Sequence, residues 1–294
     1  MSNLKEIRKR IASVKSTKQI TQAMKMVAAA KLRKAQQAIL QVRPYANSIH
    51  ELLAELANHP VYDIDSPLFN KREVNKVLIV AISSNRGLCG AFNANVIKHT
   101  VTLIEKYTEQ GIKPENIYLW GFGKKAIHIL EKRGYNVVEK NYEIFDALTF
   151  ENVKEISETL VDKFSKGEFD KIELVYNSFK NPATQIVVSE QFLPLEKPEA
   201  GGDLNSDYIF EPDFYNIIEN LAPRALAMHL FKALLDSFAS EHGARMTSMH
   251  KATDNASELI RQLTLTYNKA RQAAITKEIL EIVSGAEALR QANS

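Results

Sequence analysis

The residues best suited to do chemistry lie in the segment Ser83–Asn93, which reads Ser-Ser-Asn-Arg-Gly-Leu-Cys-Gly-Ala-Phe-Asn. It joins an apolar run, residues 77–82, to a helical pattern, and glycines in that position can form a cradle for a phosphate group. However, the segment has neither the Gly-x-x-x-x-Gly-Lys-Ser/Thr spacing nor the Gly-x-Gly-x-x-Gly spacing. We therefore interpret Gly87 and Gly90 as permitting a tight turn, and we predict no bound nucleotide or other cofactor.

Other residue types with catalytic or metal-binding potential are scattered along the chain. Cys89 is the only cysteine, which excludes an internal disulfide and a cysteine-rich zinc site. No histidine signature of a catalytic triad accompanies it, so a structural role is favoured. Of the seven histidines, His242 and His250 can share a helix face, but this pattern is too weak to indicate zinc. We predict no catalytic residue and no metal ligand, hence a chain that is not itself an enzyme.

Positive charge is concentrated at the N-terminal end. Residues 1–43 contain eleven basic residues and a single acid, Glu6, a net charge of +10 against −7 for the remainder. Such a helix favours an acidic partner, which can be nucleic acid, anionic lipid or an acidic protein surface. Because the first aromatic residue is Tyr45, the basic residues lack the aromatic interleaving typical of nucleic-acid binding. The simpler interpretation is that these basic residues form a solvent-exposed helix face.

Both ends of the chain are predicted to be long helices. Residues 3–57 are rich in helix formers with apolar residues three or four apart, and Pro44 is expected to bend or split this helix. Residues 212–290 show the same periodicity, with Pro223 near the start. No uncharged apolar run reaches the roughly 20 residues of a membrane-spanning helix, and the N-terminus lacks a signal-peptide core.

The middle of the chain alternates short apolar runs with helical patterns, which predicts a parallel α/β sheet. Strands are expected at 77–82, 116–121 and 171–176, with a possible edge strand at 185–192. Helices are expected at 91–110, 123–133 and 150–166, and residues 198–207 should form a polar loop.

The fold class is therefore α/β, with domains at 1–57, 74–195 and 212–294. Helices this long cannot bury their apolar faces alone, so we predict that the terminal helices pair as an antiparallel coiled coil beside a central Rossmann-like domain. Seam positions occupied by alanine, threonine and methionine indicate a thin pair of modest intrinsic stability. An ordinary helical bundle or a homo-oligomer remains an alternative at this stage.

Two terminal blocks, Ile7–Ala35 and Ser240–Ala256 continuing at Leu265–Ala286, resemble the signatures of the F-type ATP synthase γ subunit family. The central Ser83–Gly90 segment is also similar to that family, in which Asp often stands in place of Asn85. The match follows the whole chain in order, although residues 100–210 agree mainly in layout. Because Cys89 stands alone, the inserted redox cysteine pair of chloroplast members is absent, and a bacterial protein is expected.

The resemblance implies a rotor subunit that transmits torque between ion flow through the membrane c ring and ATP synthesis or hydrolysis at the β subunits. It would be present in a single copy, peripheral to the cytoplasmic face of the inner membrane, without nucleic acid. Its partners would be the α and β subunits enclosing the shaft, the ε subunit and the c ring.

The resemblance also implies three groups of contact residues. Those expected to contact the β ring are Met26, Lys31, Arg33, Lys34, Arg245, Arg271, Gln272 and Thr276. Within this group, Lys31, Arg33 and Lys34 would face an acidic lever loop of β. Those expected to form an apolar tip in a bearing are Ile279, Ile282, Val283, Ala286 and Leu289. Those expected at the foot, near ε or the c ring, are Tyr208 and Glu211.

Overall fold

A computed structural model describes residues 2–57, 66–70, 72–195, 211 and 213–292. The chain forms two compact units. One contains residues 28–246, and the other contains residues 1–27 together with 247–294. The loop predicted at 198–207 lies outside the described residues, as does Tyr208.

The unit of residues 28–246 is built on a five-stranded sheet in the order β3-β2-β1-β4-β5. Strands β1 to β4 are parallel, and β5 runs antiparallel to β4. The strands span Val77–Ile82 (β1), Ile117–Phe122 (β2), Asn136–Asn141 (β3), Lys171–Asn181 (β4) and Thr184–Leu193 (β5). Every residue of β1 is buried, as expected of a central strand covered on both faces.

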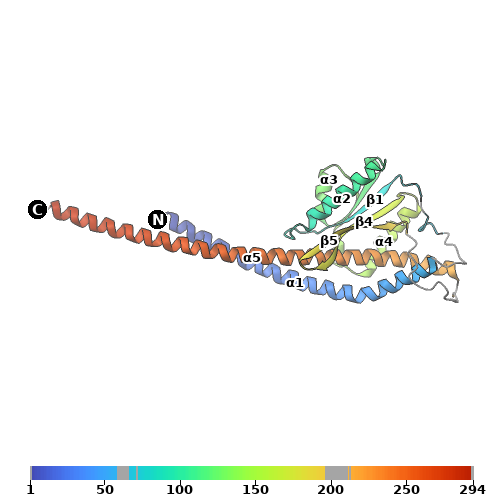
Figure 1. Cartoon of the computed structure of the whole chain (residues 1–294), viewed down its shortest axis with the longest axis horizontal. Coiled ribbons are helices and arrows are strands. Elements are labelled where there is room, and N and C mark those ends of the chain that lie inside the picture. Colours follow the sequence, from blue (N-terminus) through green and yellow to red (C-terminus); the bar gives the residue numbers. More distant parts are fainter. Residues whose placement is uncertain (1, 58–65, 71, 196–210, 212, 293–294) are drawn as a thin grey trace. The chain divides into compact units, whose positions relative to one another are not determined.

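Helices cover both faces of this sheet (Figure 1). On one face, α2 (Phe92–Glu109) and α3 (Lys124–Lys132) bury an apolar stripe against β1 and β2. On the other face, α4 (Phe150–Ser165) packs together with residues of α1 and α5. Two short 3₁₀ turns, η1 (Pro114–Asn116) and η2 (Glu143–Phe145), complete the connections.

The predicted α/β class is confirmed, but the sheet is mixed and not wholly parallel, because β5 runs antiparallel to β4. Two strands also differ from the prediction. The segment that forms β3 was not predicted, because Asn136–Asn141 is polar and mostly exposed at the sheet edge and gives no apolar run. Strand β4 extends five residues beyond the predicted end at residue 176, because it continues into the hairpin with β5. The segment expected as a possible edge strand is β5, at the opposite edge from β3.

The two long helices are α1, Ser2–Ala57, and α5, Phe214–Ala292. Each contains an internal proline, Pro44 in α1 and Pro223 in α5. The predicted alternative that Pro44 splits its helix is wrong, because α1 is one helix from Ser2 to Ala57. The predicted bend stays a prediction. No helix among the described residues combines the length and apolarity needed to cross a membrane.

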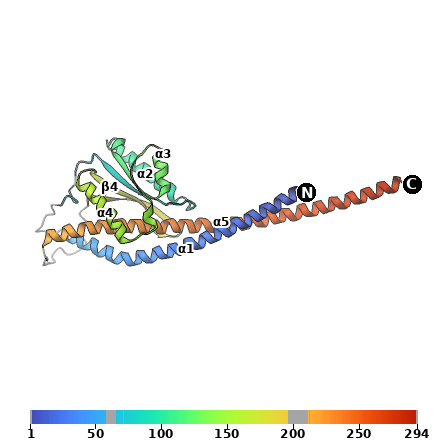
Figure 2. The same cartoon turned by 180° about the vertical axis from the view of Figure 1, so that it is seen from behind.

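In the unit formed by the two chain ends, the early part of α1 and the late part of α5 lie side by side (Figure 2). The Thr21 and Thr253 hydroxyls are 2.8 Å apart, and Lys25 Nζ lies 3.3 Å from His250 Nδ1. The partner's number falls as the α1 number rises, so the segments are antiparallel. Small polar side chains at this seam agree with the thin pairing that the sequence predicts.

Candidate functional site

The segment that most resembles a phosphate cradle folds into a closed turn after β1. The Ser84 hydroxyl donates a hydrogen bond of 2.6 Å to the Arg86 carbonyl, and the Ser84 amide donates to Asn93 Oδ1 at 3.0 Å. Asn93 Nδ2 donates in turn to Cys89 Sγ at 3.2 Å. The polar side chains of the turn are therefore bonded to one another. Gly90 adopts a φ of 59° there, a left-handed conformation that suits the predicted tight turn.

The ligand crevice of a doubly wound sheet lies where the strand order reverses, at the carboxyl ends of the two diverging strands. Here those strands are β1 and β4, and helix α5 packs into this position. Ser240 Oγ of α5 donates to the Asn177 carbonyl of β4 at 3.1 Å. Arg245 Nη2 donates to the carbonyls of Arg86 and Gly87 at 3.0 and 3.2 Å. The helix thus occupies the crevice with its own side chains.

Arg245 is the centre of a buried polar cluster. It is only 8% exposed, and its Nη1 lies 2.6 Å from Glu241 Oε1, whose residue is 7% exposed. Burial raises the pKa of Glu241 despite the opposing effect of the guanidinium. For His242, burial and then the charges of Arg245 and Lys31 lower the pKa to about 3, so this ring is neutral.

Cys89 lies beside this cluster and is 1% exposed. It packs with Phe92 and Ala244, and burial raises the pKa of its thiol. Because the thiolate is the reactive form, this environment suits the structural role that the sequence favours over a nucleophile.

No motif in the sequence marks Glu241 and His242 as partners of Arg245. The spacing of four residues between Glu241 and Arg245 is a signal that was available, because such residues face each other on a helix. Arg245 was predicted to contact a β subunit, yet its donors are engaged by Arg86, Gly87 and Glu241. A direct contact with a partner stays a prediction, and it would require these bonds to be exchanged.

The three predicted basic contacts of α1, Lys31, Arg33 and Lys34, are all exposed in the unit of residues 28–246. None of them takes part in an ion pair within the described part of the chain. Glu211, predicted at the foot, is exposed just before α5.

The remaining predicted contacts lie in the unit formed by the chain ends, and all with described side chains are exposed. Met26 is 62% exposed on α1, whereas Arg271, Gln272 and Thr276 are exposed on α5. Antiparallel pairing places Met26 beside residues near 249, so at 1.5 Å per residue about 30 Å of helix separates it from Arg271. Met26 and the predicted contact residues of α5 therefore lie at separate places along the helical pair.

The predicted apolar tip is also open to solvent in the single chain. Ile279 is 55% exposed, Ile282 is 71% exposed and Val283 is 49% exposed. Ala286 is exposed, and the side chain of Leu289 lies outside the described residues. Large exposed apolar side chains are thus gathered at one helix end, a pattern typical of interaction surfaces.

Comparisons with known proteins match the chain over its whole length. The family model described as ATP synthase matches residues 3–289. The ATP synthase gamma chain of Flavobacterium psychrophilum is 55% identical and covers 99% of this chain and 100% of that protein. The gamma chain of Christiangramia forsetii is 56% identical, covering 98% of this chain and 99% of that protein.

Solved structures give the same fold at lower identity. A chain of the Euglena gracilis mitochondrial ATP synthase OSCP/F1/c-ring structure superposes with a TM-score of 0.69 at 21% identity, covering 100% of this chain and 96% of that chain. A chain of the Tetrahymena thermophila central stalk/c-ring structure gives a TM-score of 0.57 at 21% identity, covering 79% of this chain and 99% of that chain. With family model and relatives both matched from end to end, the chain belongs to the ATP synthase gamma chain family.

Proposed function

We propose that this chain is the central-stalk rotor subunit of an F-type ATP synthase. It transmits torque between ion flow through the membrane c ring and ATP synthesis or hydrolysis at the β subunits, and it holds no catalytic site. The observation that carries this proposal is the identity of 55–56% to gamma chains over nearly the full length of both proteins.

The contact surfaces support this role. An isolated amphipathic helix needs a partner for its apolar side chains, and from Ile275 to Val283 the large apolar residues of α5 are exposed. Other subunits that surround the helix would cover these side chains. The crevice of the sheet, in turn, is filled by α5 residues such as Ser240 and Arg245. The chain is thus arranged for contacts with other proteins.

The partners we propose are the alternating α and β subunits around the helical pair, with ε and the c ring at the other end. The chain would be present once in each complex and lie at the cytoplasmic face of the inner membrane as a peripheral subunit. Foot contacts are assigned to Tyr208 and Glu211.

Native mass spectrometry of complexes recovered with this chain from its own cells tests the proposal. One copy of the chain with alternating α and β subunits is expected, together with loss of ATPase activity when the chain is removed. A free homodimer, or a complex with nucleic acid that lacks α and β, would overturn it.

The basic contacts give the first specific prediction. Replacing Lys31, Arg33 and Lys34 together by glutamine is expected to weaken assembly with α and β several-fold, and to reduce its dependence on salt. Exposed charge pairs contribute only about 0.2–1 kcal/mol each and are screened by salt. Reconstitution of ATPase activity from purified subunits across a salt series measures both effects.

The matched control replaces Lys98, Lys113 and Lys132 by glutamine, which removes the same charge from exposed positions of the sheet unit. This control should assemble with the salt dependence of the wild type. If both triple variants behave alike, net charge rather than the α1 surface controls assembly.

A further inference from the structure

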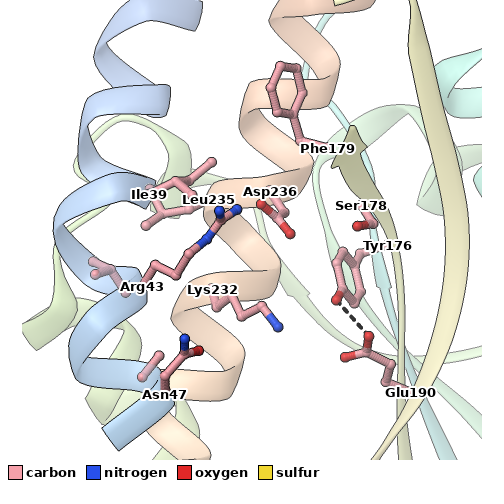
Figure 3. A pocket seen from close by; sticks show the side chains of 12 residues that line it. Ile39, Arg43, Asn47, Tyr176, Ser178, Phe179, Glu190, Lys232, Leu235 and Asp236 are labelled. Atoms are coloured by element: carbon pink, nitrogen blue, oxygen red, sulfur yellow. Dashed lines mark hydrogen bonds between the residues drawn. The ribbon is translucent and has the colours of Figure 1, made fainter. Parts of the chain in front are cut away.

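A cavity of about 300 Å³ lies between α1, the β4–β5 hairpin and α5 (Figure 3). A neighbouring hollow of about 480 Å³ shares Ala46, Asn47, Glu190 and Lys232 with it. Both lie within the unit of residues 28–246. Their α5 residues lie on the N-terminal side of the Arg245 cluster. The first cavity is partly open to solvent, and polar side chains line part of it, so it can hold water.

Asp236 of α5 is the buried acid of this cavity. It is 8% exposed, and its carboxylate has no hydrogen bond or ion pair with any described residue. Figure 3 shows it facing the same space as Arg43 of α1 and Lys232 of α5. Both cations lie beyond ion-pair distance of Asp236, so the carboxylate has no direct counter-charge.

The second acid of the cavity, Glu190 of β5, is already paired. Tyr176 of β4 donates its hydroxyl to Glu190 Oε1 at 2.9 Å, and His229 Nε2 lies 2.8 Å from Glu190 Oε2. These bonds lower the pKa of Glu190, with the His229 contact contributing most. Glu190 is therefore charged, and it adds a repulsive charge facing Asp236.

These surroundings shift the pKa of Asp236 in opposite directions. Burial raises its pKa, Lys232 and Arg43 lower it, and Glu190 raises it, with a net result of about 6 against an ordinary value of 3.8. Loss of hydration therefore outweighs the two cations. A carboxyl in this position takes up a proton more readily when the cavity is closed than when water enters.

The part of α1 that covers the cavity is most deeply buried at its two ends, and between them its apolar side chains pack against the core while partly exposed. Leu32 and Ala35 are buried against α5 on one side, and Leu53 and Leu56 are buried in the main core on the other. Between these anchors the residues that line the cavity, Ile39, Val42 and Ala46, are only partly buried. Pro44 lies in the same stretch and removes one backbone hydrogen bond of the helix.

We propose that Asp236 is a proton-binding site that controls how firmly residues 39–47 of α1 are held against α5. With the proton bound, the Asp236 carboxyl group is neutral and loses little hydration free energy when α1 lies over the cavity. Once the proton is lost, the carboxylate gains hydration when α1 moves away, so opening becomes easier. This regulation of α1 goes beyond the rotor role and does not depend on the partners of the chain.

The direction of the pH effect follows from linkage. Because the pKa of Asp236 is higher in the closed state, the stabilisation by its proton is complete below about pH 3.8 and is lost as the pH rises through about 6. If opening fully hydrates the carboxylate, the opening constant should rise about ten-fold between pH 5 and pH 7.5.

Hydrogen–deuterium exchange of the full-length chain, corrected for intrinsic rates, measures this constant for peptides covering residues 39–47. Wild-type protection of these peptides should fall by up to about ten-fold from pH 5 to pH 7.5. Asp236→Asn should abolish most of this change, whereas Glu219→Gln, at an exposed acid of α5, should retain it.

A second variant serves as an independent measurement should Asp236→Asn fold poorly. Arg43→Gln, at an exposed position, removes a cation that lowers the pKa of Asp236, so the midpoint of the exchange transition should move to higher pH. An unchanged pH dependence in Asp236→Asn, or no pH dependence of residues 39–47 in the wild type, would overturn the proposal.

Discussion

Arg245→Ala is expected to lower the free energy of unfolding of the sheet-containing unit by about 3–5 kcal/mol, because it leaves a buried charge without its partner. The carboxylate of Glu241, 7% exposed, would lose the guanidinium that lies 2.6 Å away. The carbonyls of Arg86 and Gly87 would lose their donor as well. Thermal unfolding followed by circular dichroism should show a midpoint lowered by on the order of 10 °C.

Two further variants distinguish the destabilisation caused by an unpaired buried charge from the destabilisation caused by shortening a long side chain. Arg33→Ala removes an exposed arginine and should change stability by less than about 0.5 kcal/mol. Replacing both members of the pair, Glu241→Leu with Arg245→Met, removes the stranded carboxylate and should recover part of the loss. If Arg245→Ala were as mild as Arg33→Ala, the guanidinium would not be engaged within the chain.

This result bears on the predicted contact of Arg245 with a β subunit. A side chain that joins α5 to the turn after β1 fixes the position of that turn, whether or not it also touches β. The turn displays Leu88, 64% exposed with a φ of 63°, a conformation that a leucine adopts only when its surroundings impose it. Arg245 supplies part of that constraint through the two preceding carbonyls.

The regular parts of the fold follow from local pattern. Strand β1 is a continuous apolar run because helices bury both of its faces, and the stripes of α2 and α4 repeat at helical spacing because one side of each packs on the sheet. Strand β3 lacks such a pattern because an edge strand needs little burial. Its place is fixed by pairing with β2, which local sequence does not encode.

Pro44 shows how solvent exposure decides a local conflict. A proline inside a helix leaves the carbonyl four residues earlier, that of Leu40, without its amide donor. Leu40 is 65% exposed and Pro44 is also exposed, so water can satisfy that carbonyl and the helix need not end. The sequence predicts that Pro44 disturbs the helix. Whether the helix ends there depends on which face of α1 is turned to solvent.

Solvent exposure also divides the polar and contact residues discussed above into two groups. Residues of the exposed helix ends, such as Arg271 and Met26, were identified by resemblance and lie open in the single chain. Arg245 and Asp236 behave differently, because their burial arises from packing against segments more than fifty residues away in sequence. Local pattern therefore does not locate buried polar clusters, because packing between distant segments creates them.

Replacing Arg271 and Gln272 together by alanine is expected to lower coupled ATP synthesis and ATPase activity of the assembled complex by on the order of ten-fold, the effect of losing one interface hot spot. Both side chains are exposed and have no ion pair or hydrogen bond with another described residue. Alanine is the best helix former, so α5 itself should not be weakened. Any loss must then come from contacts with other subunits.

The matched control is Asn268→Ala with Lys269→Ala. It removes the same chemistry, one amide and one positive charge, from exposed positions of the same helix within one turn. Activity should be measured per assembled complex, since a fall in the amount of complex would indicate an assembly defect rather than a lost torque contact. Full coupled activity in the Arg271–Gln272 double variant would remove these residues from the β contact. Equal losses of activity in both double variants would mean that the activity depends on the helix surface in general and not on a contact specific to Arg271 and Gln272.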